Sequence, residues 1–241
     1  MAVPSLNAVF GIDLSALGLS WARMLPTVAL VPAFGLRALP GPVRAVLGLM
    51  LALCIIPAVG ATTRMAPFLV SAHEPWPLLL LENVLRGIPV ALAAAIPLWA
   101  ATMAGNLVDT LRGAHEPWNT DVVAGKASHM GIVFALLSAG IFLQSGGPSR
   151  VALALATADF PAHPLLAAMH DLAGGITLAV ALAGPLFAAA IVLEVATALV
   201  ARASFPAQLY VLFPPLRALG LLIVAALVLE RIAFVLAHAM R

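Results

Sequence analysis

The stretch LLLENVLRGIPVALAAAIPLWAATMAGNLVDTLRG, residues 79–113, decides the class of this protein. Within it, Gly87–Val108 carries no charged side chain over 22 residues. A helix needs about 20 apolar residues to cross the hydrocarbon core of a bilayer. The run does not alternate apolar and polar residues as a strand of a membrane barrel would. It therefore predicts a membrane-type helix.

Similar apolar runs lie on both sides of this stretch. They are Leu14–Leu36, which Arg23 interrupts, Ala45–Thr63, Ala127–Ser149, Leu172–Leu193, and Ala218–Ala239, which Glu230-Arg231 interrupts. Unpaired strand edges are too costly in lipid, so each run is a helix candidate. We predict an all-α, polytopic membrane-type protein with about six hydrophobic helical segments.

The composition of the whole chain excludes several classes of protein. Of 241 residues, 63% are hydrophobic and 9% are charged, and the mean hydropathy is +1.10. Such a chain cannot cover a folded surface with polar groups, which argues against a cytosolic enzyme and a disordered chain. A net charge of +2 is too small for a nucleic-acid surface. We expect lipid or other apolar protein to cover much of the surface.

Prolines and glycines divide the chain. Prolines inside the apolar runs, such as Pro97 and Pro185, either kink ordinary membrane helices or belong to a packed assembly of broken helices. The sequence leaves both readings open. Glycine followed by proline at Gly146-Gly147-Pro148 predicts the end of a helix. We predict connections at Arg37–Arg44, Gly113–Lys126, Ala156–Asp171 and Glu194–Arg217.

The chain carries no recognisable catalytic motif and no cysteine–histidine cluster, so we expect no enzyme activity, cofactor or metal. The charged residues at or within the apolar runs are the informative ones, because a buried charge in a membrane protein usually has a function. Helix spacing predicts that Glu82 pairs with Arg86, and that Asp109 pairs with Arg112. Glu194 also lies at the end of a run. Arg23 lies in the middle of one and should have a partner carboxylate on another helix or another chain.

These observations leave two functions equally favoured. One is a structural subunit of a membrane channel, and the other is a small-solute or ion transporter. A transporter usually shows a series of intramembrane acids or an internal repeat. Here the acids lie at the ends of the runs.

Four blocks of the sequence, taken in order, resemble the FliR/SctT family of type III secretion export-gate subunits. Ala22–Pro57 resembles its N-terminal signature, Leu79–Gly113 its central stretch, Gly146-Gly147-Pro148 its later glycine pair and Leu193–Leu222 its C-terminal block. The positions that match the family's motifs are Pro26, Pro32, Glu82, Gly87, Gly105, Asp109, Gly113, Gly146, Gly147, Glu194, Pro206 and Arg217.

The resemblance implies a non-enzymatic subunit of the channel through which unfolded substrate proteins leave the bacterium. It implies bent helical hairpins that resemble a P-type subunit (residues 1–171) fused to a Q-type subunit (residues 172–241). The partners would be the P-type and Q-type subunits, the U-type switch protein, the transiting substrates and membrane lipid. The location would be the inner membrane, with the assembled subunit raised out of the bilayer. We favour a virulence injectisome over a flagellar system.

The resemblance also implies roles for particular residues. The polar loop 113–126 takes the place of the family's channel plug, with Gly113, His115, Glu116, Pro117, Trp118, Asn119 and Asp121 as its candidate residues. The candidates for ion pairs between subunits are Arg23, Glu82, Arg86, Asp109 and Glu194. The segment Glu194–Arg217 would form the hairpin loop that meets the switch protein.

Overall fold

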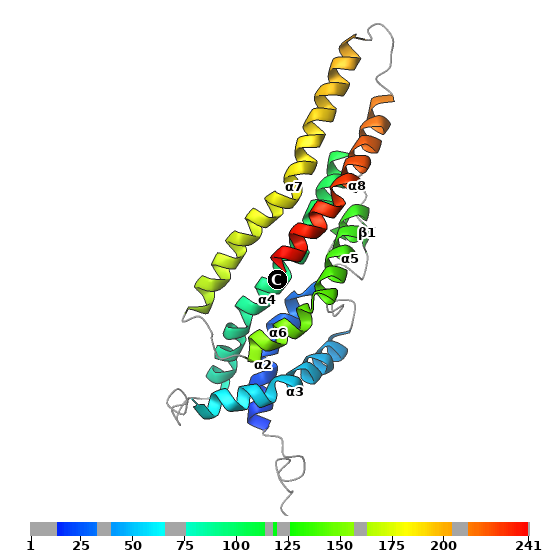
Figure 1. Cartoon of the computed structure of the whole chain (residues 1–241). Coiled ribbons are helices and arrows are strands. Elements are labelled where there is room, and N and C mark those ends of the chain that lie inside the picture. Colours follow the sequence, from blue (N-terminus) through cyan, green and yellow to red (C-terminus); the bar gives the residue numbers. More distant parts are fainter. Residues whose placement is uncertain are drawn as a thin grey trace, which may run out of the picture. The chain divides into compact units, whose positions relative to one another are not determined.

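The computed structural model describes residues 14–32, 40–65, 76–113, 118–119, 126–156, 163–203 and 212–240. Almost all of them are helical (Figure 1), which confirms the all-α prediction. Each of the six predicted apolar runs lies largely on a helix. The elements are α2 (Leu14–Leu30), α3 (Gly41–Met65), α4 (Trp76–Leu111), β1 (Trp118–Asn119), β2 (Lys126–Ala127), α5 (His129–Gln144), α6 (Gly147–Ala156), α7 (Pro164–Ala203) and α8 (Phe213–Ala239).

Three predicted connections are wrong in part because helices extend into them. Helix α3 already begins at Gly41, α7 begins at Pro164 and runs on past Glu194, and α8 begins at Phe213. Each of these helices has a proline in its first turn. Proline suits the start of a helix, where its missing N–H would have no intrahelical partner. The prolines that we took for interruptions therefore mark helix starts.

Prolines inside the apolar runs do not end the helices. Helix α2 continues through Pro26, α4 through Pro89 and Pro97, and α7 through Pro185. The predicted helix end at the glycine pair is confirmed, because α5 stops at Gln144 and Gly146 adopts a left-handed φ of +74°. A left-handed residue just beyond a helix end is the position where glycine costs least.

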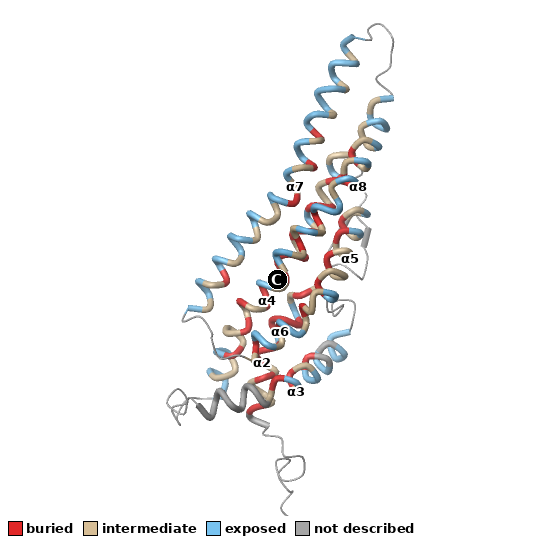
Figure 2. The backbone as a smooth tube through the Cα atoms, viewed as in Figure 1, coloured by how far each residue is buried: buried red, intermediate tan, exposed pale blue. Residues whose placement is uncertain are grey.

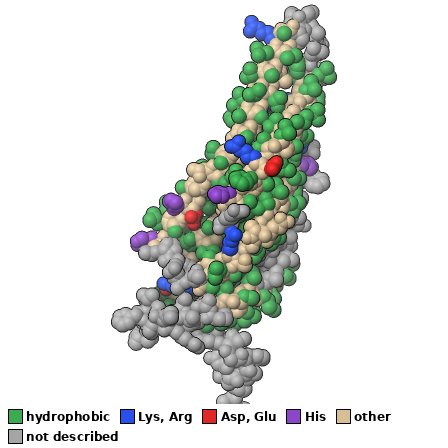
Figure 3. Space-filling view, viewed as in Figure 1, with side chains coloured by type: hydrophobic (Ala, Val, Ile, Leu, Met, Phe, Trp, Pro, Cys, Tyr) green, Lys and Arg blue, Asp and Glu red, His purple; other side chains and the backbone are tan. Residues whose placement is uncertain are grey.

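Helices α4, α7 and α8 are each long and apolar enough to cross a membrane, and α5 with α6 would add a fourth span if the bent pair is one span. The three differ in how far the chain itself covers them (Figure 2). Half of the most apolar stretch of α4 is buried, against 17% of that of α7 and 22% of that of α8. In Figure 3 hydrophobic side chains cover most of the visible surface, and charged side chains are few. The described chain is thus a multi-pass membrane-type protein with a large uncovered apolar surface.

The chain divides into two compact units that interleave in sequence. The first comprises Met1–Ala95 and Gly146–Leu172, and the second comprises Ile96–Ser145 and Ala173–Arg241. In the first unit, α2 packs against α3, and α3 against α6. The second unit has a core of alanines from α4 and larger side chains from α5, α7 and α8, among them Phe134, Leu182, Leu186, Ile232 and Leu236. The division into a P-like and a Q-like part at residue 171 concerns a likeness to other subunits and stays a prediction.

Candidate functional site

Two glycines mark a close approach in the second unit, where the end of α4 meets the start of α5. A Cβ atom on Gly105 would lie 2.4 Å from the carbonyl oxygen of Met130, and one on Gly131 would lie 2.0 Å from Asn106 Oδ1. Real Cβ atoms do not approach other atoms so closely. Glycine at both positions therefore lets the two helices come into near-backbone contact.

Asn106 of α4 holds the first residue before α5. Its Oδ1 accepts hydrogen bonds from the backbone N–H and from the hydroxyl of Ser128, both at 2.9 Å. Ser128 is the N-cap of α5, and its Oγ accepts from the N–H of Gly131 at 3.2 Å. A helix start exposes N–H groups that have no intrahelical partner, and this serine satisfies one of them.

Asp109, one turn further along α4, satisfies a second N–H group at the start of α5. Its Oδ2 accepts from the backbone N–H of Met130 at 2.7 Å, and its side chain is only 1% exposed. Its Oδ1 lies 2.7 Å from Arg112 Nε, close enough for an ion pair but not aligned for a hydrogen bond. The carboxylate thus faces both an arginine and the positive end of the α5 dipole, and each stabilises its charge. We call Asn106, Asp109, Ser128 and the N–H of Met130 the inter-helix cap.

The inter-helix cap lies at the base of the predicted plug loop. Gly113, where the loop leaves α4, has a left-handed φ of +82°. Further along, β1 and β2 pair in antiparallel register, with Trp118 opposite Ala127 and Asn119 opposite Lys126. The candidate plug residues His115, Glu116, Pro117 and Asp121 lie outside the described residues. The plug assignment itself stays a prediction.

A second polar cluster is buried in the first unit around Arg23 of α2, which is 3% exposed. Its Nε and Nη2 donate to Asn83 Oδ1 of α4, at 3.2 and 2.9 Å. Its Nη1 donates to the carbonyl oxygen of Leu155 at 3.1 Å. That carbonyl lies in the last turn of α6, where backbone oxygens lack intrahelical donors and a cation is favoured. Arg23 therefore joins α2, α4 and α6.

Gly87 and Pro26, both family-motif positions, lie beside this cluster. A Cβ atom on Gly87 would lie 2.2 Å from the carbonyl oxygen of Arg23 and 3.3 Å from Pro26 Cγ. The glycine thus lets α4 approach α2 closely. Asn83, one turn before Gly87 on α4, then lies within reach of the Arg23 guanidinium. Pro32 follows the end of α2, and Pro206 lies outside the described residues.

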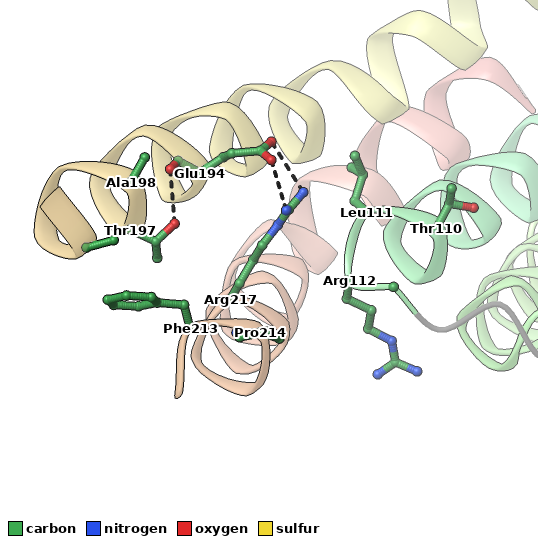
Figure 4. Close-up of a pocket in the computed structure, with 11 residues that line it drawn as sticks. Thr110, Leu111, Arg112, Glu194, Thr197, Ala198, Phe213, Pro214 and Arg217 are labelled. Atoms are coloured by element: carbon green, nitrogen blue, oxygen red, sulfur yellow. Dashed lines mark hydrogen bonds and ion pairs between the residues drawn. The ribbon is translucent and has the colours of Figure 1, made fainter. Parts of the chain in front are cut away.

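The other candidate charges form exposed pairs within the chain. Arg86 pairs with Glu82 across one turn of α4, as predicted from their spacing. Arg217 Nη1 and Nη2 lie 3.0 and 3.3 Å from the two carboxylate oxygens of Glu194, and this pair joins α7 to α8. The Glu194–Arg217 pair borders an open pocket of about 440 Å³ between these helices and the end of α4. The Arg112 guanidinium points away from this pair (Figure 4). Exposed pairs of this kind contribute little to stability, about 0–1 kcal/mol.

Sequence reasoning identified Arg23, Asp109 and Arg112 but missed the neutral residues around them. Asn106 was readable as the amide in the apolar run Gly87–Val108, three residues before Asp109 on one helix face, and Asn83 lies between the charged residues Glu82 and Arg86. Ser128, near the start of the apolar run Ala127–Ser149, is a residue type that favours an N-cap. Ion pairs between subunits stay a prediction for all five charged candidates. Among the described residues no group of histidine, cysteine, aspartate and glutamate could hold a metal ion.

Comparison with known proteins places the chain among secretion components. The model of the family "Bacterial export proteins, family 1" matches residues 14–241. Over 74 residues the chain is 39% identical to the "Secretion system apparatus protein SsaT" of Salmonella typhimurium. That match covers 30% of this chain and 28% of the relative, so it spans less than a third of either.

Proposed function

We propose that this chain, which belongs to the family of bacterial export proteins, family 1, is a subunit of the export apparatus of a bacterial type III secretion system. The family is the one predicted from the sequence, and bacterial export proteins are what a secretion-apparatus role requires. The name of the relative from Salmonella, a secretion system apparatus protein, supports the same role. The family match leaves the transporter alternative without support.

The observation that carries the proposal is the length of the uncovered apolar surface on α7. Its 40 residues form a helix of about 60 Å, at 1.5 Å per residue, whereas the bilayer core is about 30 Å thick. Large apolar side chains are exposed along it from Leu165 to Val200. An average helix tilt of about 20° cannot place so long a surface in lipid. Sister subunits would cover the remainder.

We therefore assign this chain to an inner-membrane channel that it forms with P-type and Q-type subunits and that unfolded substrates cross. The switch protein of the U-type would be a further partner. In the assembly, part of α7 and α8 would stand outside the bilayer against protein. The exposed pairs, with Glu194 at 61% and Glu82 at 49% exposure, are better placed to contact another subunit than Arg23 or Asp109.

The proposed function predicts that the chain depends on its partners. Expressed alone and extracted in detergent, it should aggregate or be recovered in small amounts, because its apolar α7 and α8 faces remain uncovered. Co-expressed with the P-type and Q-type subunits encoded with it, it should elute as one complex of defined mass. Size-exclusion chromatography with native mass spectrometry measures both. A stable, homogeneous particle of the chain alone, with no partner retained on co-expression, would contradict the proposal.

The loop 113–126 is proposed to close the channel of that assembly. Deleting residues 115–122 should raise the leakage of small ions in cells that carry the assembled complex, because a polar loop in the pore would be shortened. A conductivity or dye-uptake assay measures the leakage. The control keeps the loop intact and replaces Thr110, at the exposed end of α4, by alanine. Normal assembly with unchanged leakage would refute the plug assignment.

A further inference from the structure

The inter-helix cap fixes the distance between the two points at which the 113–126 loop joins the described helices. Gly113 follows α4 by two residues, and Ser128 immediately precedes α5. Asn106 and Asp109 reach from the last two turns of α4 to the backbone at Ser128 and Met130. The loop therefore leaves and returns at a junction held by side-chain hydrogen bonds, in addition to the packing of α4 against α5.

We infer that Asn106 and Asp109 are positioning residues that hold the two described ends of this loop together, and that the closure proposed for the loop depends on them. The inference rests on the proposed function. Three features support it: both acceptors are aimed at backbone donors at the start of the neighbouring helix, the Asp109 carboxylate is almost completely buried, and Gly105 and Gly131 let the two helices approach closely.

Asp109 carries the larger part of this role. A buried carboxylate is costly unless it is paired and hydrogen-bonded, and here the Met130 N–H and Arg112 both face it. The charge belongs at this position only while α5 begins beside it. If the start of α5 moved away, the carboxylate would lose the N–H and the helix dipole together. Opening the junction is therefore opposed by electrostatics as well as by packing.

The test compares Asp109→Asn, Asp109→Leu and Asn106→Leu in the assembled complex, with Thr110→Ala as the matched control. Thr110 lies next to Asp109 on α4, but its hydroxyl bonds only its own helix, at the carbonyl of Asn106. Asparagine keeps an acceptor oxygen for Met130 and loses the charge, whereas leucine removes both. Each complex is examined by hydrogen–deuterium exchange of the peptide that spans Ser128–Gly131 and by ion leakage.

We expect exchange in this peptide to be about tenfold faster in Asp109→Leu and less changed in Asp109→Asn, since a charge-assisted hydrogen bond protects the amide. Ion leakage should rise in the same order, and Thr110→Ala should change neither quantity. If Asp109→Leu does not assemble, Asp109→Asn and Asn106→Leu carry the test.

Two results would overturn the inference. Faster exchange with unchanged leakage would show that the inter-helix cap is structural only, and unchanged exchange would show that the cap does not hold the start of α5. The loop deletion separates this failure from that of the proposed function. If the deletion leaks and the cap variants do not, the plug stands and the positioning role fails. If neither leaks, the plug assignment itself fails.

Discussion

Replacing Gly87 by alanine is expected to destabilise the protein by about 1–3 kcal/mol, the range for overpacked contacts. The new methyl group would lie 2.2 Å from the carbonyl oxygen of Arg23 and 3.2 Å from its carbonyl carbon. These are backbone atoms of α2, so they cannot rotate away as a side chain would. The helices must separate, and the bonds from Arg23 to Asn83 lengthen with them.

The matched control for Gly87→Ala is Gly140→Ala. Gly140 is also inside a helix, and apart from the neighbouring residues and backbone of its own helix no atom lies within 4 Å of the Cβ that alanine would add there. Alanine favours a helix over glycine by about 1 kcal/mol, so the control should be neutral or stabilising. Pulse proteolysis of this chain at increasing denaturant, in the complex co-expressed with the P-type and Q-type subunits, compares the two free energies of unfolding. Equal effects of the two substitutions would show that α2 and α4 are not in contact at Gly87.

Replacing Arg23 by methionine is expected to cost about 2–6 kcal/mol, because two buried acceptors lose their guanidinium donors at about 1–3 kcal/mol each. The acceptors are Asn83 Oδ1 and the carbonyl oxygen of Leu155. Methionine approximates the length of the arginine stem, so the loss reports the hydrogen bonds more than the packing. The free energy of unfolding of Arg23→Lys should lie between those of the unchanged protein and of Arg23→Met, since a single ammonium group lacks the planar fork that reaches both partners.

A second substitution makes the Arg23 prediction specific. The double variant Arg23→Met with Asn83→Leu should lose less stability than the sum of the two single losses, by about 1 kcal/mol or more, because the two residues act as a unit. Arg231→Met is the control, since Arg231 is an exposed arginine in the apolar helix α8 and should change stability by less than about 0.5 kcal/mol. Strict additivity of the Arg23 and Asn83 effects in the same unfolding assay would rule out the described contact.

The sequence predicted which segments are helical better than where the helices end. Runs such as Gly87–Val108 are long and uncharged, and lipid leaves a backbone of that composition few alternatives. The connections predicted at Ala156–Asp171 and Glu194–Arg217 contain Pro164, Pro214 and Pro215, which lie in the first turns of helices. Proline both begins and breaks helices, and a single sequence does not say which. The ends of α3, α7 and α8 were therefore misplaced.

The charged members of the two polar clusters could be predicted, and their partners could not. Arg23 and Asp109 stand out because ionisable residues are rare in apolar runs. Their partners are largely backbone groups, the carbonyl of Leu155 and the N–H of Met130, and every residue except proline carries both. Only the fold decides which backbone group meets the charge. The pairs Glu82–Arg86 and Asp109–Arg112 were found because helix spacing alone brings them together.

The length of α7 has a consequence for the life of the newly made chain. Alone in the membrane, a helix of about 60 Å would have to tilt, cluster or leave apolar side chains in water, at a cost that grows with each ångström of mismatch. The proposed assembly would remove that cost. An unassembled copy would thus differ from an assembled one in the length of its uncovered apolar helix.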